Sequence, residues 1–148
     1  MKFTTQEEYG IRCLLQIARA GEGCSMTIGE ISQAEGLSEA NVGKITRVLR
    51  IGGFITSERG RDGGYTLARA PQEIVIGEVL AMLGDRLLDT DFCAKHSGVR
   101  TFCVHSVDCS VKTLWENVQY AIDEVLLNTK LSDLLPKRSE IESGAVGE

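Results

Sequence analysis

The sequence lacks any long apolar run, since no stretch approaches the roughly 20 residues that a membrane-spanning helix requires. Its first residues, Met-Lys-Phe-Thr-Thr-Gln-Glu-Glu-Tyr, hold no apolar segment and already carry acids, so they do not resemble a secretory signal. Five cysteines are an odd number, which does not make a complete disulfide framework. These absences predict a cytoplasmic protein whose cysteines bind metal or take part in redox chemistry.

Motifs of the common enzyme classes are absent as well. Gly60-Arg-Asp-Gly-Gly is rich in glycine, but a strand pattern follows it and no Gly-Lys-Ser/Thr occurs, which excludes a phosphate-binding loop. No nucleophile elbow or pair of acids accompanies the cysteines. A reactive cysteine assisted by His96 or His105 is a remaining enzyme hypothesis. We expect instead a protein that is not an enzyme and that has no small-molecule substrate.

The charge is unevenly distributed along the 148 residues. The net charge of −5 by itself argues against nucleic acid as a partner. Residues 41–69, however, carry six basic and two acidic residues, for a local charge of +4, whereas residues 71–148 carry −6. A local basic patch is what contact with DNA phosphates requires.

Three helices are predicted first, because apolar residues recur there with helical spacing. They cover residues 5–20, 28–35 and 39–51. Gly36-Leu37-Ser38 joins the second to the third, and its glycine suits a helix end while its serine suits a helix start. Two short helices joined by such a turn form the helix-turn-helix pattern of DNA-binding proteins.

A β-hairpin is predicted directly after the third helix. Residues 54–58 and 65–68 have strand composition, and Arg59-Gly-Arg-Asp-Gly-Gly64 between them is a turn sequence. A hairpin in this position is a wing. The predicted fold is therefore mainly α with a small β-hairpin wing: a winged helix-turn-helix domain followed by a long C-terminal dimerisation helix.

That long helix is predicted over residues 110–129, after a short helix over 76–83. Apolar residues recur along it at spacings of four and three, as in a coiled-coil seam; they are Val111, Trp115, Val118, Ile122 and Val125. The helix is too short to stand alone, so we expect one face on its own domain and another on a second copy. The expected divisions are 1–84 (DNA-binding domain), 85–109 (cysteine-rich loop), 110–135 (dimerisation helix) and 136–148 (mobile tail).

The predicted recognition helix and wing offer candidate DNA contacts, because the second helix of this motif enters the major groove by its N-terminal half. Asn41 suits a bidentate contact with adenine, and Lys44 suits the acceptors of guanine. Phosphate or minor-groove contacts are expected from Ser38, Arg47, Arg59 and Arg61. The alternative is that these residues form an ordinary solvated helix face and turn.

Three of the five cysteines and both histidines lie within the 17 residues from Cys93 to Cys109. This segment has no helical or strand period and belongs to a long run, about 85–109, of the length that is normally functional or disordered. Cysteine is among the most buried residue types, so Cys93, Cys103 and Cys109 in a polar loop indicate a bridge, a metal site or a redox role. Three thiolates and a histidine would also suit zinc. Cys13 is expected in the core and Cys24 in a turn.

Several landmarks occur together over residues 1 to about 135. They are Thr-Thr-x-x-Glu-Tyr9-Gly-Ile-Arg12, Gly-Leu-Ser38, Arg59-Gly-x-x-Gly-Gly-Tyr65-x-Leu-Ala, Ile76-Gly-Glu-Val79, the three cysteines before Trp115, and Leu131-Ser-Asp-Leu. In these the chain resembles the iron–sulphur-dependent winged-helix regulators of bacteria, of the IscR, NsrR and RirA type. The resemblance implies a homodimer that binds a double-stranded DNA operator, with long helices paired across a twofold axis and each cysteine loop near the partner's first helix.

The resemblance further implies an iron–sulphur cluster on Cys93, Cys103 and Cys109, in a regulator, expected to be a repressor, that senses redox state, nitric oxide or iron. The IscR type has a histidine three residues after its last cysteine, but Lys112 stands there and cannot serve. In the NsrR type an aspartate just before the Tyr-Gly pair is the ligand, and Glu8 occupies that position.

Glu8 is therefore the first candidate for the fourth ligand, and it favours a [4Fe–4S] over a [2Fe–2S] cluster. Glu7, His96 and His105 are the others. Glu8 would alternatively close a capping box with Thr5. A thiol switch or a zinc site in place of the cluster is the alternative function.

Overall fold

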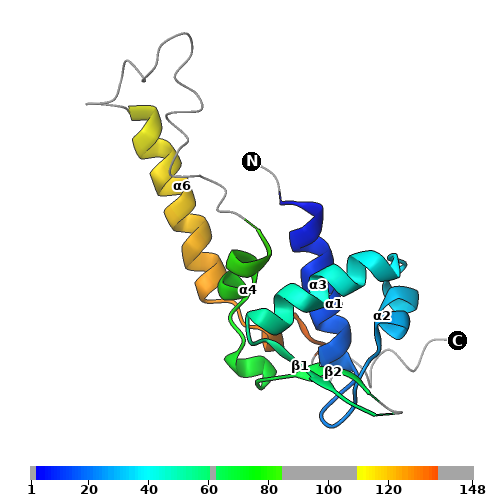
Figure 1. The fold of residues 1–148 in the computed structure, drawn as a ribbon. Coiled ribbons are helices and arrows are strands. Elements are labelled where there is room, and N and C mark those ends of the chain that lie inside the picture. Colours follow the sequence, from blue (N-terminus) through cyan, green and yellow to red (C-terminus); the bar gives the residue numbers. More distant parts are fainter. Residues whose placement is uncertain (1–2, 61–62, 85–109, 137–148) are drawn as a thin grey trace, which may run out of the picture.

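The structure is a computed structural model that describes residues 3–60, 63–84 and 110–136. Its elements run in the order α1 (Thr5–Arg19), α2 (Ile28–Glu35), α3 (Glu39–Ile51), β1 (Ile55–Glu58), β2 (Gly64–Leu67), η1 (Pro71–Glu73), α4 (Ile76–Leu83), α6 (Ser110–Leu127) and η2 (Leu131–Leu134). This confirms a mainly helical winged helix-turn-helix fold with a long C-terminal helix (Figure 1). The predicted cysteine loop and nearly all of the predicted tail lie outside the described residues.

The helix-turn-helix forms as its local sequence predicts. Gly36 ends α2 in the left-handed region, at φ 67°, where glycine carries no steric penalty. Ser38 begins α3, and its hydroxyl accepts a hydrogen bond from the Asn41 backbone N–H at 3.2 Å. Of the apolar residues on α2, only Ile31 is fully buried, and Ala34 is exposed.

The capping box of α1 is shifted by one residue from its predicted place. Thr4, in extended conformation, is the N-cap, and its hydroxyl accepts a hydrogen bond from the Glu7 N–H at 3.2 Å. The Glu7 carboxylate accepts in return from the Thr4 N–H at 2.6 Å. The predicted pairing of Thr5 with Glu8 is therefore wrong, since Thr5 is already helical and Glu8 takes no part in the box.

The wing is a two-stranded antiparallel hairpin in which Ile55 pairs with Leu67 and Thr56 with Thr66. A third segment joins it: Met26, before α2, pairs with Tyr65 through backbone hydrogen bonds of 3.0 and 2.7 Å. No sequence pattern indicates this bridge, because a single extended residue has no periodicity. It joins the hairpin, near its turn, to the segment that leads into α2.

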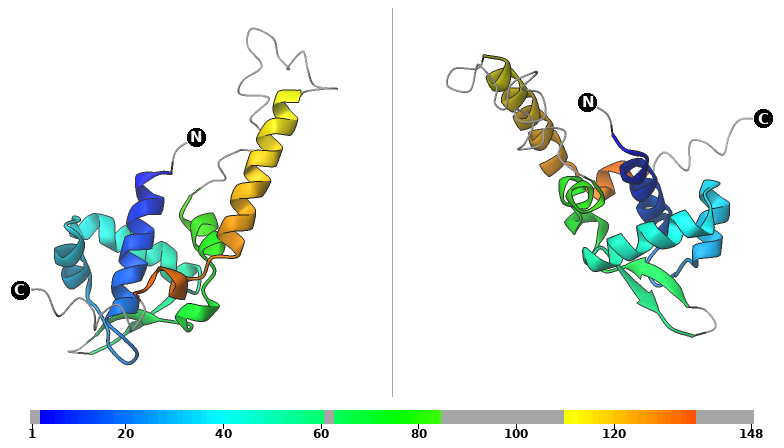
Figure 2. Two further views of the ribbon diagram at one scale, coloured as in Figure 1. Left: turned by 180° about the vertical axis from the view of Figure 1, so that it is seen from behind. Right: turned by 45° about the horizontal axis from the view of Figure 1, so that its top comes forward.

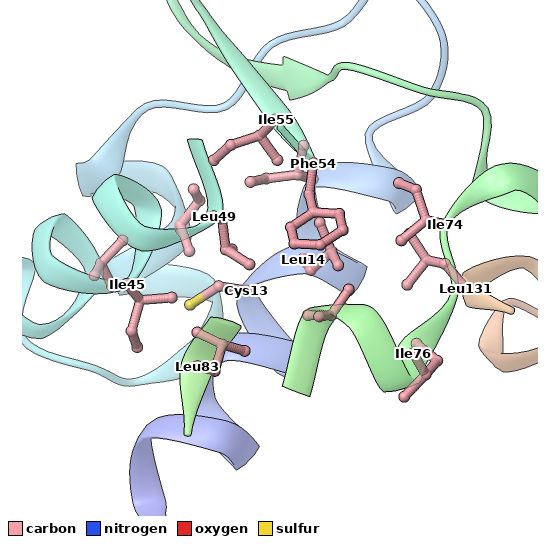
Figure 3. Packing of buried hydrophobic residues seen from close by; sticks show 14 residues of the cluster. Cys13, Leu14, Ile45, Leu49, Phe54, Ile55, Ile74, Ile76, Leu83 and Leu131 are labelled. Atoms are coloured by element: carbon pink, nitrogen blue, oxygen red, sulfur yellow. The ribbon is translucent and has the colours of Figure 1, made fainter. Parts of the chain in front are cut away.

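One core connects the DNA-binding helices to α4 and η2 (Figure 3). Cys13 and Leu14 of α1 meet Ile45 and Leu49 of α3 there, together with buried side chains from β1, α4 and η2. Burial of a leucine or isoleucine stabilises a fold by about 1.5–3 kcal/mol. Through this core, α1 contacts α2 and α3 of the helix-turn-helix as well as α4.

Helix α6 packs on α4 near its C-terminal end, while its N-terminal half extends away from the domain (Figures 1 and 2). Gln119, 7% exposed, faces the domain. Val111 and Val125 of the predicted seam are 57% and 65% exposed. The helix thus has one covered face and one uncovered apolar face. Within the described ranges no helix is long and apolar enough to cross a membrane.

An ion pair ties α1 to the end of α2. The Arg12 Nε donates to the Glu35 carboxylate at 2.7 Å, and its Nη2 donates to the Glu35 carbonyl oxygen at 2.8 Å. Burial raises the pKa of the Glu35 carboxyl, but hydrogen bonds from Arg12 and Gln16 outweigh that effect, so the pKa lies below its ordinary value. The folded state therefore favours the charged carboxylate.

Glu35→Gln should remove part of the acid sensitivity of the fold. A carboxyl with a lowered folded pKa contributes stability above its unfolded pKa, about 4.3, and loses it as the pH falls through the folded pKa. Urea unfolding at neutral and acid pH should show the variant less stable than wild type at neutral pH and closer to it in acid. Glu22→Gln, at an exposed turn position, is the control. Equal pH profiles for wild type and Glu35→Gln would contradict this assignment.

Candidate DNA-binding face and cluster site

The exposed side of α3 carries the predicted DNA contacts. Ser38, Asn41, Lys44 and Arg47 are all exposed and recur every three residues from the helix start. The opposite side is fixed in the core by Val42, Ile45 and Leu49. Because the core holds α3 rigidly and the N-terminus of a helix favours anions, the described face suits phosphate and base-edge contacts.

The wing extends from the other end of this surface (Figure 2). Arg59, which follows β1, is exposed, and the chain turns at Gly60. Arg61 lies outside the described residues. Of the two predicted wing contacts, the structure therefore places only Arg59 on the surface.

The two neighbouring glutamates in the first turn of α1, Glu7 and Glu8, have different environments. Glu7 is only 6% exposed and closes the capping box. Glu8 is exposed and stands one helical turn before Arg12. Its carboxylate is thus not held by the cap, and it is chemically suited to act as an oxygen ligand. Sequence reasoning missed the role of Glu7, although Thr4 three residues earlier was a signal for it.

A groove of about 450 Å³ lies between α1, α4 and α6. Its lining includes Phe3 before α1, Glu7 in the first turn of α1, Gly84 after α4, and Gln119 and Leu126 from α6. The groove reaches Gly84, after which the chain enters residues 85–109.

The cysteines divide into two groups. Cys93, Cys103 and Cys109, with His96 and His105, lie outside the described residues, so the structure does not place the predicted cluster ligands relative to Glu8. Cys13 is fully buried in the core, as predicted, and Cys24 is exposed.

The buried thiol is also chemically inert. Burial, together with the nearby charge of Glu35, raises the pKa of Cys13 to about 11. A thiol protonated at neutral pH is neither a nucleophile nor a metal ligand.

A family model described as an iron-dependent transcriptional regulator, Rrf2, matches residues 3–137. The chain belongs to the Rrf2 family. An Rrf2 relative, protein rrf2 of Nitratidesulfovibrio vulgaris, is 34% identical over 135 residues, covering 91% of this chain and 87% of that protein. The structure of T. potens IscR is 29% identical with a TM-score of 0.74 and covers 100% of this chain and 93% of that one.

A second solved Rrf2-like structure is the oxidized form of Staphylococcus aureus CymR. It is 26% identical with a TM-score of 0.71 and covers 90% of this chain and 95% of that one. The chain is therefore a transcriptional regulator of the Rrf2 family, built on a winged helix-turn-helix, and the family is not one of enzymes.

The two described cysteines should differ sharply toward a thiol reagent. In a variant with Cys93, Cys103 and Cys109 replaced by serine, Ellman's reagent at neutral pH should label Cys24 rapidly. Cys13 should react only after denaturant is added, because its thiol is buried and protonated. A further Cys24→Ser change should abolish the native reaction. Labelling of two thiols per native chain would contradict the burial of Cys13.

Proposed function

We propose that this regulator is a homodimeric repressor whose operator affinity is controlled by an iron–sulphur cluster. Cys93, Cys103 and Cys109 hold the cluster, and Glu8 of the partner subunit supplies the fourth ligand. The observation that carries the cluster assignment is the position of Glu8: exposed, on the first turn of α1, and outside the capping box.

The DNA-binding part of the proposal assigns different tasks to the exposed side chains. Asn41 and Lys44 lie on the N-terminal half of α3 and reach base edges in the major groove. Arg47 lies a turn further on and contacts phosphate, as do Arg59 and Arg61 of the wing. Ser38, whose hydroxyl caps α3, presents the helix N-terminus to a phosphate.

Dimerisation is supported by the uncovered face of α6. Val111, Leu114 and Val125 are more than half exposed, and the N-terminal half of the helix extends beyond its own domain (Figure 1). An exposed apolar stripe along a helix favours pairing with a second helix. Pairing of two copies along α6 brings Ser110, which follows the cysteine segment in the sequence, to the same interface.

The donor set fits an iron–sulphur cluster. Thiolates are its preferred ligands, and a carboxylate as the fourth ligand is weakly held, which suits a cluster that is gained and lost. When bound, the cluster would supply the redox and ligand chemistry of sensing. A change at the cluster can then reach the helix-turn-helix through α1. Glu8 lies on the same helix as Arg12, and Arg12 binds Glu35 at the end of α2.

Replacing Asn41 with alanine should weaken operator binding by about 1–3 kcal/mol with little effect on non-specific DNA, because base contacts carry the sequence preference. Arg47→Ala should weaken both kinds of binding and reduce the salt dependence, as expected for a phosphate contact. Fluorescence anisotropy with operator and scrambled duplexes measures both effects. Asn117→Ala, an exposed position on α6, is the matched control. Equal losses on both duplexes for Asn41→Ala would contradict base recognition.

Replacing Glu8 with alanine should alter the cluster and leave the fold intact. Because Glu8 is exposed and outside the capping box, its loss should change the free energy of unfolding by less than about 0.5 kcal/mol. Mössbauer spectroscopy of anaerobically purified protein should show a changed iron environment, and the cluster should be lost faster in air. Glu22→Ala is the control. A Mössbauer spectrum identical to that of wild type would remove Glu8 as a ligand.

A thiol switch, or a zinc site, is the second candidate function. It is favoured by the likeness to CymR, which was solved in an oxidized form. Metal analysis separates the candidates: iron and sulphide support the cluster, zinc supports a structural ion, and no metal with oxidant-dependent operator binding supports the switch.

A further inference from the structure

The end of α4 lies unusually close to the first turns of α1, and two glycines make this approach possible. A Cβ on Gly10 would come within 2.3 Å of the Leu83 side chain, and Figure 3 shows Leu83 at the end of α4 beside α1. A Cβ on Gly84 would come within 2.0 Å of Glu7 Oε1 and 2.6 Å of its Cδ. Neither distance is possible for a real Cβ, so a side chain at either position would force Leu83 or Glu7 to move.

Glu7 cannot simply move aside. Its Oε2 accepts from the Thr4 N–H at 2.6 Å, and its own N–H donates to the Thr4 hydroxyl. The carboxylate is therefore held by the helix cap, and it occupies the space that a side chain at position 84 would need. A side chain at position 84 would expel it and cost the cap, which contributes about 1 kcal/mol to a helix.

We propose that Glu7 is a positioning residue that fixes the end of α4, where the cysteine segment begins, against the turn of α1 that carries Glu8. This inference rests on the proposed function. The contact fixes Gly84, the last described residue before the cysteine segment, relative to the turn of α1 that carries Glu8. Disturbing it displaces Glu8 and loosens the cluster without touching any ligand.

The test is a double-mutant cycle on Glu7→Ala and Gly84→Ala. In cluster-free protein each single change lowers stability in urea. The double variant should be no less stable than Glu7→Ala, because the added methyl group then occupies the space that the carboxylate leaves. Glu7→Gln keeps both the size and the acceptor oxygen and should behave as wild type. Gly29→Ala, whose Cβ would meet only ordinary contacts beyond 3.4 Å, is the control.

The second readout is the rate of cluster loss in air, followed by visible absorption. Gly84→Ala and Glu7→Ala should each lose the cluster about fivefold faster, the factor that corresponds to one lost cap. The inference would be overturned if the losses of stability from Glu7→Ala and Gly84→Ala simply added in the double variant. It would also be overturned if the losses were coupled but the rate of cluster loss did not change. A wild-type protein that binds no iron anaerobically would overturn the proposed function itself, and the inference with it.

Discussion

Burial of one face of α1 is the constraint on which the other described elements depend. Cys13, Leu14 and Ile17 are almost fully buried, and the helix packs on α2, α3, α4 and β2 at once. Buried side chains of this size contribute several kilocalories per mole in sum, comparable to the whole stability of a small domain. Any change at the N-terminal turn of α1 therefore acts on an element that cannot shift without moving the helix-turn-helix.

In the proposed mechanism, α1 connects the surface that binds DNA to the group that senses. Through Arg12 and its core face, α1 holds the helix-turn-helix; through Glu7 and Gly10 it contacts the end of α4; and its first turn presents Glu8. A regulator needs a rigid connection between the group that detects and the surface that binds. Here that connection is a single helix of 15 residues.

Much of the fold could be predicted from local sequence. Gly36 and Ser38 determine the turn between α2 and α3 by backbone conformation and capping alone, and glycine-rich composition locates the wing. The start of α1 could not be decided locally, because Thr4 with Glu7 and Thr5 with Glu8 have the same spacing. Tertiary packing decides it, since only the first choice places a carboxylate against Gly84. The bridge from Met26 to Tyr65 is equally non-local.

The candidate site divides in the same way. Helical spacing alone separated the core face of α3 from the exposed residues Asn41, Lys44 and Arg47, because burial follows periodicity. Separating Glu7 from Glu8 required the structure, since their roles differ by one residue of helix register. The proposed cysteine ligands rest on sequence and resemblance alone, because they lie outside the described residues.

The central claim is that a cluster bound to this chain controls its affinity for the operator. Its most direct test is an anaerobic operator titration of one preparation, before and after its cluster is removed by chelation. The account predicts operator affinities that differ by at least about tenfold between the two forms, equivalent to a coupling free energy of about 1.4 kcal/mol. Identical affinities for cluster-loaded and cluster-free protein would contradict it.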